Sequence, residues 1–249
     1  MLSTSFLMTS LAGASTMLGS FLIFRKKGKG EGTLVASLAF AAGVMICVSL
    51  IDLIPESFST LEKYLSPLPL VCIILIGINI GIIFSNYIED KVTKFENNSS
   101  LYKIGIISMF AIILHNIPEG IATYISCENN FHLGLKLTLA IALHNIPEGI
   151  SISIPIYYAT KKKGRAFFYT MISGLSEVMG AIIAYLFLQN LTNAIFMGFL
   201  YSIIAGIMLT ISIKELLPTS FSYQNTKKTI VYFLIGVFFM LISHFLLSI

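Results

Sequence analysis

Charged residues are scarce in this chain of 249 residues. Lysine, arginine, aspartate and glutamate together make up 11% of the sequence, against about 25% in an average soluble domain. Hydrophobic residues make up 56%, and the mean hydropathy is +0.87. A soluble globule of this size has no way to keep so much apolar surface from water. The composition therefore excludes a water-soluble enzyme, a nucleic-acid-binding module and a disordered protein, and it indicates a polytopic membrane protein.

Cysteine pairs and leader signals are absent as well. The three cysteines form no CxxC pair, so no disulfide can be inferred, and Cys47 and Cys72 are expected in apolar packing. No basic segment precedes the first apolar run, and further apolar runs follow it. We therefore expect a membrane-spanning helix at the start of the chain and not a cleaved signal.

Eight apolar runs are long enough to cross a bilayer as helices. They fall at about 3–24, 33–54, 68–88, 104–126, 133–159, 166–188, 192–213 and 229–248. Eight spans of about 20 residues use about 160 residues, which leaves no room for a second soluble domain. We expect an all-α polytopic membrane protein with a single transmembrane domain over residues 1–249.

Basic residues are divided unequally between the loops. Only Lys63 and Lys136 fall on one side of the expected membrane, and the other fourteen fall on the opposite side. The fourteen are Arg25, Lys26, Lys27, Lys29, Lys91, Lys94, Lys103, Lys161, Lys162, Lys163, Arg165, Lys214, Lys227 and Lys228. Basic loops stay in the cytoplasm. The pattern predicts a multi-pass protein of the plasma membrane, the inner membrane in a bacterium, with both termini outside the cytoplasm.

Two internal repeats are visible. The segment HNIPEGI occurs at 115–121 and again at 144–150, and AAGVMICVSLIDLIP at 41–55 resembles IAGIMLTISIKELLP at 204–218. The similarity between 41–55 and 204–218 could be due to chance, because both segments are rich in small and apolar residues. The exact seven-residue repeat could not arise by chance. In the expected topology both pairs run in opposite directions across the bilayer. Inverted repeats of this kind, with helices interrupted at mid-membrane, are typical of secondary transporters.

The repeated motif places ionisable groups deep in the membrane. At 1.5 Å per residue, His115 and Glu119 lie about 18 and 24 Å along their span, and so do His144 and Glu148. A charge at this depth costs about 2.5–3.5 kcal/mol. These carboxylates therefore need partners, a cavity or a proton.

Each motif has the donors of a metal site. His and Glu four residues apart share one helix face, and Asn116 and Asn145 can add carbonyl oxygens. Pro118 and Pro147 lack an N–H, so each is expected to bend its helix and free a backbone carbonyl beside the site. Imidazole with carboxylate suits Zn²⁺, Fe²⁺, Mn²⁺ and Co²⁺. The alternative is a buried His–Glu pair that only joins two helices, but such a pair would not require the same set twice.

Other candidate residues lie on neighbouring spans. Glu177 could complete the metal site or stay protonated against another helix, and Met45 could be a thioether ligand or core packing. Asp52, Glu56 and Glu215 could attract a cation at an entrance or exit, or could simply be solvated helix ends. His132 and His244 receive no role.

The sequence resembles the ZIP family of metal transporters, in particular its bacterial ZupT-like branch. The likeness rests on HNIPEG at 115–120 and 144–149, SGLSEVMGA at 173–181, FAAGVM at 40–45 and DLIPES at 52–57. It covers the whole chain. Many relatives carry a His-rich loop after the third span, whereas residues 91–103 contain no histidine. We expect no metal-sensing loop here.

The resemblance implies a fold and a site. It implies eight helices in a 3+2+3 inverted repeat that carry divalent metal into the cytoplasm. It implies a binuclear centre bridged by its two motif glutamates. One subsite would be His115, Glu119, His144, Glu148 and Met45, and the other would be Asn116, Asn145, Glu119, Glu148 and Glu177.

Three functions are compared. The first is a transporter for zinc, with iron, manganese, cobalt and cadmium as further cargo, with no organic cofactor and with the lipid bilayer and a possible homodimer as partners. The second is an integral-membrane di-metal enzyme, which the lack of an HExxH motif and the small number of histidines disfavour. The third is a passive metal channel.

Overall fold

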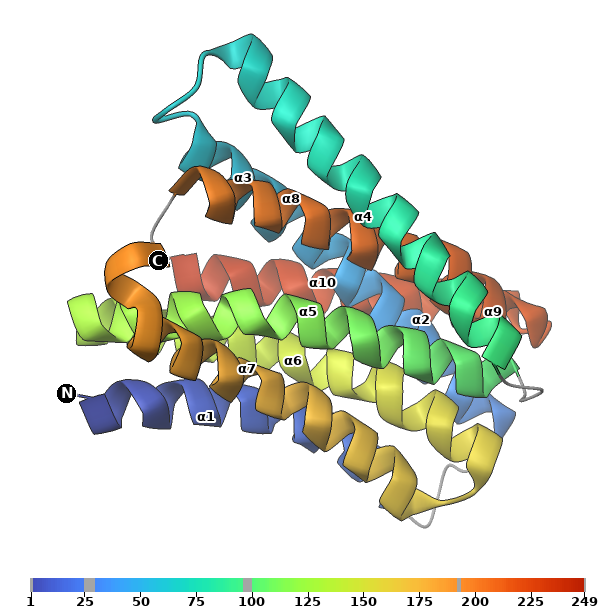
Figure 1. The fold of residues 1–249 in the computed structure, drawn as a ribbon. Coiled ribbons are helices and arrows are strands. Elements are labelled where there is room, and N and C mark those ends of the chain that lie inside the picture. Colours follow the sequence, from blue (N-terminus) through green and yellow to red (C-terminus); the bar gives the residue numbers. More distant parts are fainter. Residues whose placement is uncertain (1, 25–29, 96–99, 192–193, 249) are drawn as a thin grey trace.

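The computed structural model describes residues 2–24, 30–95, 100–191 and 194–248. Within these residues the chain is helical and contains no strand, which confirms the all-α class (Figure 1). The elements are α1 (Leu2–Gly19), η1 (Ser20–Phe24), α2 (Glu31–Val48), η2 (Ser49–Leu53), α3 (Ile54–Leu61), α4 (Pro67–Phe95), α5 (Ser100–Asn129), α6 (Phe131–Thr160), α7 (Lys163–Leu191), α8 (Ala194–Ile211), η3 (Ser212–Leu216), α9 (Leu217–Ser222) and α10 (Thr226–Ser248). Four of the basic residues used for the orientation lie outside the described residues, namely Arg25, Lys26, Lys27 and Lys29.

Eight helical segments in the described part of the chain are long and apolar enough to cross a membrane, as expected. They are Thr4–Phe24, Glu31–Leu61, Pro67–Lys91, Leu101–Asn129, Gly134–Thr160, Lys163–Phe187, Ala194–Ser222 and Thr226–Leu246. The second and seventh segments continue well beyond the expected ends near 54 and 213. Their apolar runs end at charged residues, but the helical backbone continues through Pro55 and Pro218. Both prolines stand in the first turn of the following helix, directly after a π-helical turn.

The helix interruptions are π turns, and they do not occur at the motif prolines. Helices α5 and α6 continue through Pro118 and Pro147, so the motif prolines do not interrupt them. Instead, η2 and η3 are π-helical turns. The Ile54 N–H donates to the Ser49 carbonyl, and the Leu217 N–H donates to the Ser212 carbonyl. A turn widened just before a proline relieves the clash of the ring with the carbonyl of the preceding turn.

Contacts recur in pairs between the first and last thirds of the chain. Ser57 Oγ donates to the Gly198 carbonyl at 2.6 Å, and Ser220 Oγ donates to the Val35 carbonyl at 3.0 Å. Ser57 corresponds to Ser220 and Val35 corresponds to Gly198, so each bond is the repeat-related copy of the other. The same offset in residue number relates the two π turns. They show that the α2–α3 and α8–α9 segments lie antiparallel. This arrangement supports an inverted repeat.

Close helix contacts obey the same relation. Gly43 of α2 faces the Phe233 carbonyl of α10, and its counterpart Gly206 of α8 faces the Ile78 carbonyl of α4. In α1 and α7, Gly13 and Gly174 face each other's carbonyls. Only a residue without Cβ permits backbones to approach this closely. The glycines thus fix how each helix pair crosses.

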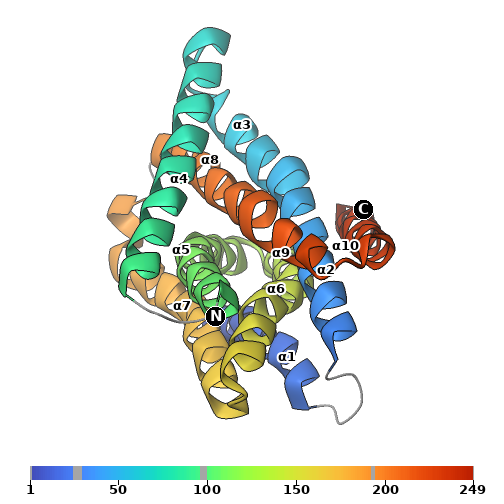
Figure 2. The same cartoon turned by 90° about the vertical axis from the view of Figure 1, so that its right-hand side faces the viewer.

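The helices form two groups (Figure 2). Helices α1, α5, α6 and α7 pack closely on one another, while α2, α3, α4, α8, α9 and α10 form the second group. Because α1 belongs with α7, the two inverted repeats interlock and are not separate bodies. The HNIPEG helices α5 and α6 lie side by side in the first group, with α2 of the second group packed against α6.

Candidate metal centre

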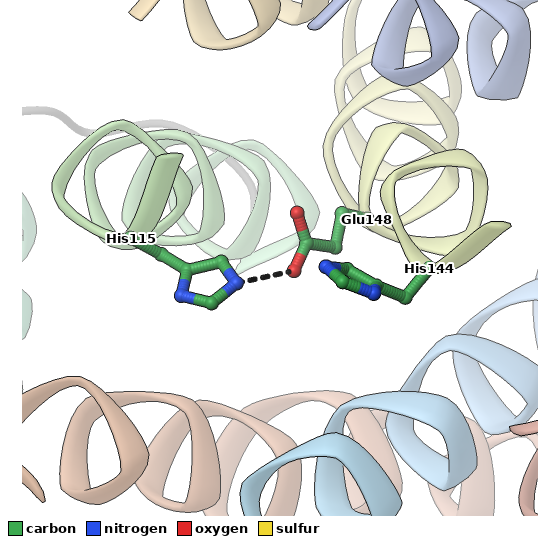
Figure 3. A group of neighbouring side chains, drawn as sticks. All are labelled: His115, His144 and Glu148. Carbon is green, nitrogen blue, oxygen red and sulfur yellow. Dashed lines mark ion pairs between the residues drawn. The ribbon is translucent and has the colours of Figure 1, made fainter. Parts of the chain in front are cut away.

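Helices α5 and α6 bring the two HNIPEG motifs together. The helices run antiparallel, so the histidine of each motif comes near the glutamate of the other. His115 and Glu148 are fully buried, and His144 and Glu119 are 5% and 8% exposed. Within the described residues, His115, His144 and Glu148 form a group whose ligand atoms all lie within 4.8 Å of one another (Figure 3).

The distances match those between ligands of one metal ion. Glu119 Oε1 lies 3.1 Å from His115 Nε2 and 2.9 Å from His144 Nε2, and Glu148 Oε1 lies 3.5 Å from His115 Nε2. Ligand atoms about 2.0–2.1 Å from a tetrahedral Zn²⁺ are themselves about 3.3 Å apart. The predicted pairing of His115 with Glu119 on one face is therefore confirmed, whereas His144 pairs across the helices with Glu119.

Several buried polar atoms in this cluster have no hydrogen-bond partner. They are Nδ1 of both histidines, Oε2 of Glu119, both carboxylate oxygens of Glu148, Oδ1 of Asn116, Oδ1 of Asn145 and Oε1 of Glu177. A buried polar group without a partner costs about 1–3 kcal/mol. So many unmatched lone pairs in one place indicate a site for a cation.

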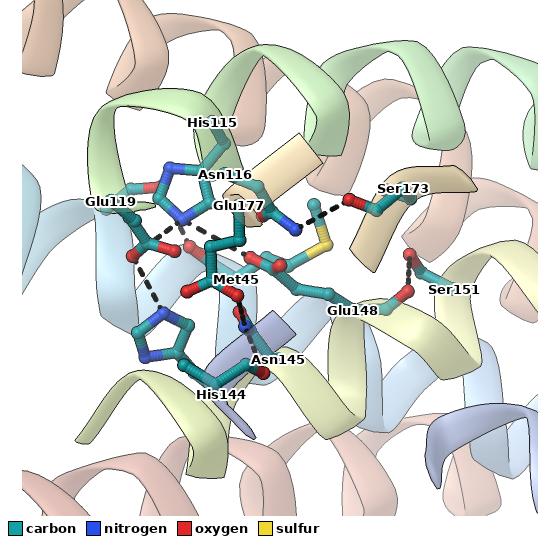
Figure 4. A network of polar contacts seen from close by, with 12 residues as sticks. Met45, His115, Asn116, Glu119, His144, Asn145, Glu148, Ser151, Ser173 and Glu177 are labelled. Atoms are coloured by element: carbon teal, nitrogen blue, oxygen red, sulfur yellow. Dashed lines mark hydrogen bonds and ion pairs between the residues drawn. The ribbon is translucent and has the colours of Figure 1, made fainter. Parts of the chain in front are cut away.

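The two asparagines are held by backbone carbonyls of α1 and α7 (Figure 4). Asn116 Nδ2 donates to the Ser173 carbonyl and Asn145 Nδ2 donates to the Ala12 carbonyl, each at 3.1 Å. Asn145 Nδ2 also donates to Glu177 Oε2 at 3.0 Å. These bonds use the amide N–H groups and leave each amide oxygen free. Glu177 thus lies beside Asn145.

The pseudo-symmetry breaks at one residue. Gly120 of α5 faces the Glu177 carbonyl, and the counterpart Gly149 of α6 faces the Thr16 carbonyl. Thr16 therefore occupies in α1 the place that Glu177 occupies in α7. It is fully buried, and its hydroxyl has no partner. The centre has three glutamates where perfect symmetry would give four.

Of the remaining candidates, Met45 lies beside this polar network, and the acidic residues make their contacts elsewhere. Met45 is fully buried on α2 in the hydrophobic core, and Figure 4 shows it in the same close view. Asp52 lies in η2 and pairs with His244, Glu56 of α3 is exposed, and Glu215 of η3 lies close to Glu89 of α4. Sequence reasoning gave His244 no role. Its partner is distant in sequence, and no spacing rule reveals such a contact.

Comparisons with known proteins agree with this site. The family model described as "ZIP Zinc transporter" matches residues 89–244, which include both motifs and Glu177. The zinc transporter ZupT of Streptococcus mutans is 38% identical over 96% of both chains. The chain belongs to the ZIP family. The ZupT proteins of Clostridium perfringens and Oceanobacillus iheyensis are each 37% identical and cover 96% and 98% of this chain, and 94% and 98% of their own lengths.

Membership in the ZIP family agrees with the architecture. The eight membrane-length helices identify a multi-pass membrane protein, and the ZIP family is a family of transporters and not of enzymes. The His/Glu cluster lies on the two helices between the interlocked repeats.

Proposed function

We propose that this chain carries divalent metal ions, with zinc as the first candidate, across a membrane into the cytoplasm. The observation that carries the proposal is the buried cluster of two histidines and two glutamates with unmatched lone pairs. Such a cluster costs folding energy unless it binds a cation. The relatives are named zinc transporters, and imidazole with carboxylate is a preferred donor set for Zn²⁺.

The proposed cargo site consists of two adjoining subsites that share the motif glutamates. The first uses the two histidines and Met45, and the second uses the two asparagines and Glu177. In full, the set is His115, Asn116, Glu119, His144, Asn145, Glu148, Glu177 and Met45. Support comes from the free amide oxygens and from the hydrogen bond between Asn145 and Glu177.

The proposed orientation follows from the basic residues. In a lipid bilayer, with the basic loops in the cytoplasm, both termini lie outside the cell. Asp52 and Glu56 then lie toward the outer mouth and Glu215 toward the inner mouth, as entrance and exit groups. The apolar side chains of α4 and α10, which are the least buried spans, then face lipid.

The proposed transport movement takes place between the two helix groups. Helices α5 and α6, which hold the cluster, pack mainly with α1 and α7 and contact the second group less extensively. Movement of the first group along the second would carry the site from one mouth toward the other. Movement of one repeat against the other would separate α1 from α7, which pack closely on each other. We therefore propose movement between the two helix groups instead.

The proposal is made for a single copy of the chain. Glycine-rich faces could in principle serve a homodimer. However, the glycines of the described membrane segments face other helices of the same chain, with Gly164 as the exception. The di-metal enzyme is less well supported, because the matching family is one of transporters.

Radioactive Zn²⁺ uptake into sealed vesicles that contain the purified protein tests the proposal. We expect uptake that saturates with Zn²⁺, exceeds that of protein-free vesicles and is reduced by Mn²⁺, Fe²⁺, Co²⁺ and Cd²⁺. Uptake that never saturates would support a channel. Stoichiometric metal binding without any uptake would contradict transport and support the enzyme.

A further inference from the structure

Asp52 and His244 form an ion pair away from the central cluster. His244 Nδ1 lies 2.7 Å from Asp52 Oδ1, and the side chains of the histidine and the aspartate are 46% and 30% exposed. Asp52 lies in the π turn η2, and His244 lies in α10, one turn before the end of that helix. The pair therefore joins the widened turn to an outer helix and is partly exposed.

The pair is in electrostatic contact with the central site. Besides His244, the Asp52 carboxylate interacts electrostatically with His144 and Glu119. The Asp52 carboxylate therefore adds a negative charge within electrostatic range of the central cluster. Such a field raises the local concentration of cations.

The pseudo-symmetry of the fold has a counterpart to this pair at the opposite mouth. In the inverted repeat, Gly43 of α2 corresponds to Gly206 of α8. With the same offset in residue number, Asp52 corresponds to Glu215. In the outer helices, Ile78 of α4 corresponds to Phe233 of α10, and with the same offset Glu89 corresponds to His244. Glu215 and Glu89 lie close to each other. Each mouth thus has one polar pair between a π turn and an outer helix.

The two pairs differ in chemistry. A role in helix packing alone would be served by either kind of pair, whereas only the Asp52–His244 mouth offers an imidazole nitrogen. A carboxylate can only accept hydrogen bonds, so Nδ1–H of His244 donates to Asp52 and Nε2 keeps its lone pair. Metal-binding histidines typically have this arrangement, with one nitrogen on the metal and the other hydrogen-bonded to a carboxylate.

We propose that His244 and Asp52 form a second metal-binding site, which captures Zn²⁺ before it reaches the central cluster. His244 Nε2 is the protein ligand, Asp52 positions the imidazole and supplies charge, and water fills the other coordination positions. One imidazole with water binds Zn²⁺ more weakly than the central donor set, and weak binding permits release inward. The position of the site in the transport route rests on the proposed function, but its ability to bind metal does not.

Chemical modification of the wild-type protein tests metal binding directly. Diethyl pyrocarbonate reacts with the free imidazole nitrogen of exposed histidines, and mass spectrometry follows each site separately. His132 is an internal control, because it is exposed and, within the described residues, has no carboxylate within ion-pair distance. With Zn²⁺ at ten times the dissociation constant, we expect modification of His244 to slow about tenfold and that of His132 to stay unchanged.

Uptake assays test the role of the site in transport. We expect His244→Ala and Asp52→Asn to raise the KM for Zn²⁺ several-fold and to leave the maximal rate near that of the wild type. His132→Ala should change neither value. Equal modification rates of His244 with and without Zn²⁺ would overturn the site, whatever the uptake shows. Zn²⁺ protection of His244 in a protein without any uptake would support the site and contradict only the proposed transport function.

Discussion

At the residue scale, a single carboxylate oxygen serves two histidines. Glu119 Oε1 lies within hydrogen-bonding distance of both His115 and His144, while Glu148 Oε1 lies 3.5 Å from His115 Nε2. Metal binding therefore replaces contacts that already hold the ligands in place, so little reorganisation is needed. Preorganised ligands lose less entropy when they bind.

Thr16 and Glu177 occupy pseudo-symmetric positions, and we expect substitutions at the two positions to have unequal effects. We expect Glu177→Ala to lower Zn²⁺ uptake at least about tenfold, because it removes a carboxylate beside the asparagine oxygens. Thr16→Ala alters the pseudo-symmetric position and should leave uptake within about twofold, since the hydroxyl has no partner. Initial uptake rates at equal protein content distinguish the two. Equal losses in both variants would contradict the assignment of Glu177.

Protonation of the central ligands predicts a pH dependence. An imidazole nitrogen or carboxylate oxygen that holds a proton cannot bind metal. Metal binding should therefore weaken as the pH falls from about 8 to about 5.5, across the range in which imidazoles gain protons. Equilibrium Zn²⁺ binding by the purified protein measures this. An affinity that stays constant over the range would count against His115 and His144 as ligands.

At the element scale, the two π turns explain why the second and seventh spans are longer than their apolar runs. Pro55 and Pro218 would normally end a helix, and the wide turn before each lets the helix continue. Asp52 and Glu215 lie inside these turns. Single π turns often occur at functional sites, and here they carry Asp52 and Glu215, the proposed entrance and exit groups.

Removal of one π turn is expected to preserve the fold. Deletion of Leu50 combined with Pro55→Ala removes the extra residue, so α2 and α3 can join as one α-helix that retains the bond from Ser57 to Gly198. The matched control is deletion of Ile76 in the regular helix α4, which rotates all later residues of that helix by about 100°. Size-exclusion chromatography in detergent should show a folded protein for the first variant only. Two misfolded proteins would contradict the π-turn interpretation.

The sequence predicted the helices better than their irregularities. Apolar run length and the position of charges sufficed for eight spans, because a bilayer demands both. The π turns were missed, since prolines follow both ordinary helix ends and widened turns. The His115–Glu119 pair followed from helix periodicity. The bond from His144 to Glu119, the Ala12 and Ser173 carbonyls, and the His244–Asp52 pair depend on helix packing, which spacing along one segment does not reveal.

At the scale of the whole molecule, the helices divide by packing and not by repeat. Gly13 and Gly174 bind α1 to α7 across the two repeats, so the cluster-bearing group contains helices from both ends of the chain. An even number of spans puts both termini at the same end, as Figure 1 shows. The proposed orientation assigns that end to the outside.

Cysteine labelling measures the orientation. In a Cys72→Ser background, which removes the exposed native cysteine, Lys63→Cys and Lys161→Cys each place one thiol at an exposed position at opposite ends. A membrane-impermeant maleimide should label intact cells at position 63 and should label position 161 only after the cells are opened. The reverse pattern would invert the proposed direction of transport.

The most direct measurement is Zn²⁺ uptake by the Glu119→Gln/Glu148→Gln variant in sealed vesicles, beside the wild type and Glu62→Gln. Both substitutions keep side-chain size and remove charge, but Glu62 is exposed and lies outside the cluster. We predict saturable uptake by the wild type and by Glu62→Gln, and uptake at the level of protein-free vesicles for the double variant, with all three proteins inserted equally. Wild-type uptake by the double variant would contradict the central site.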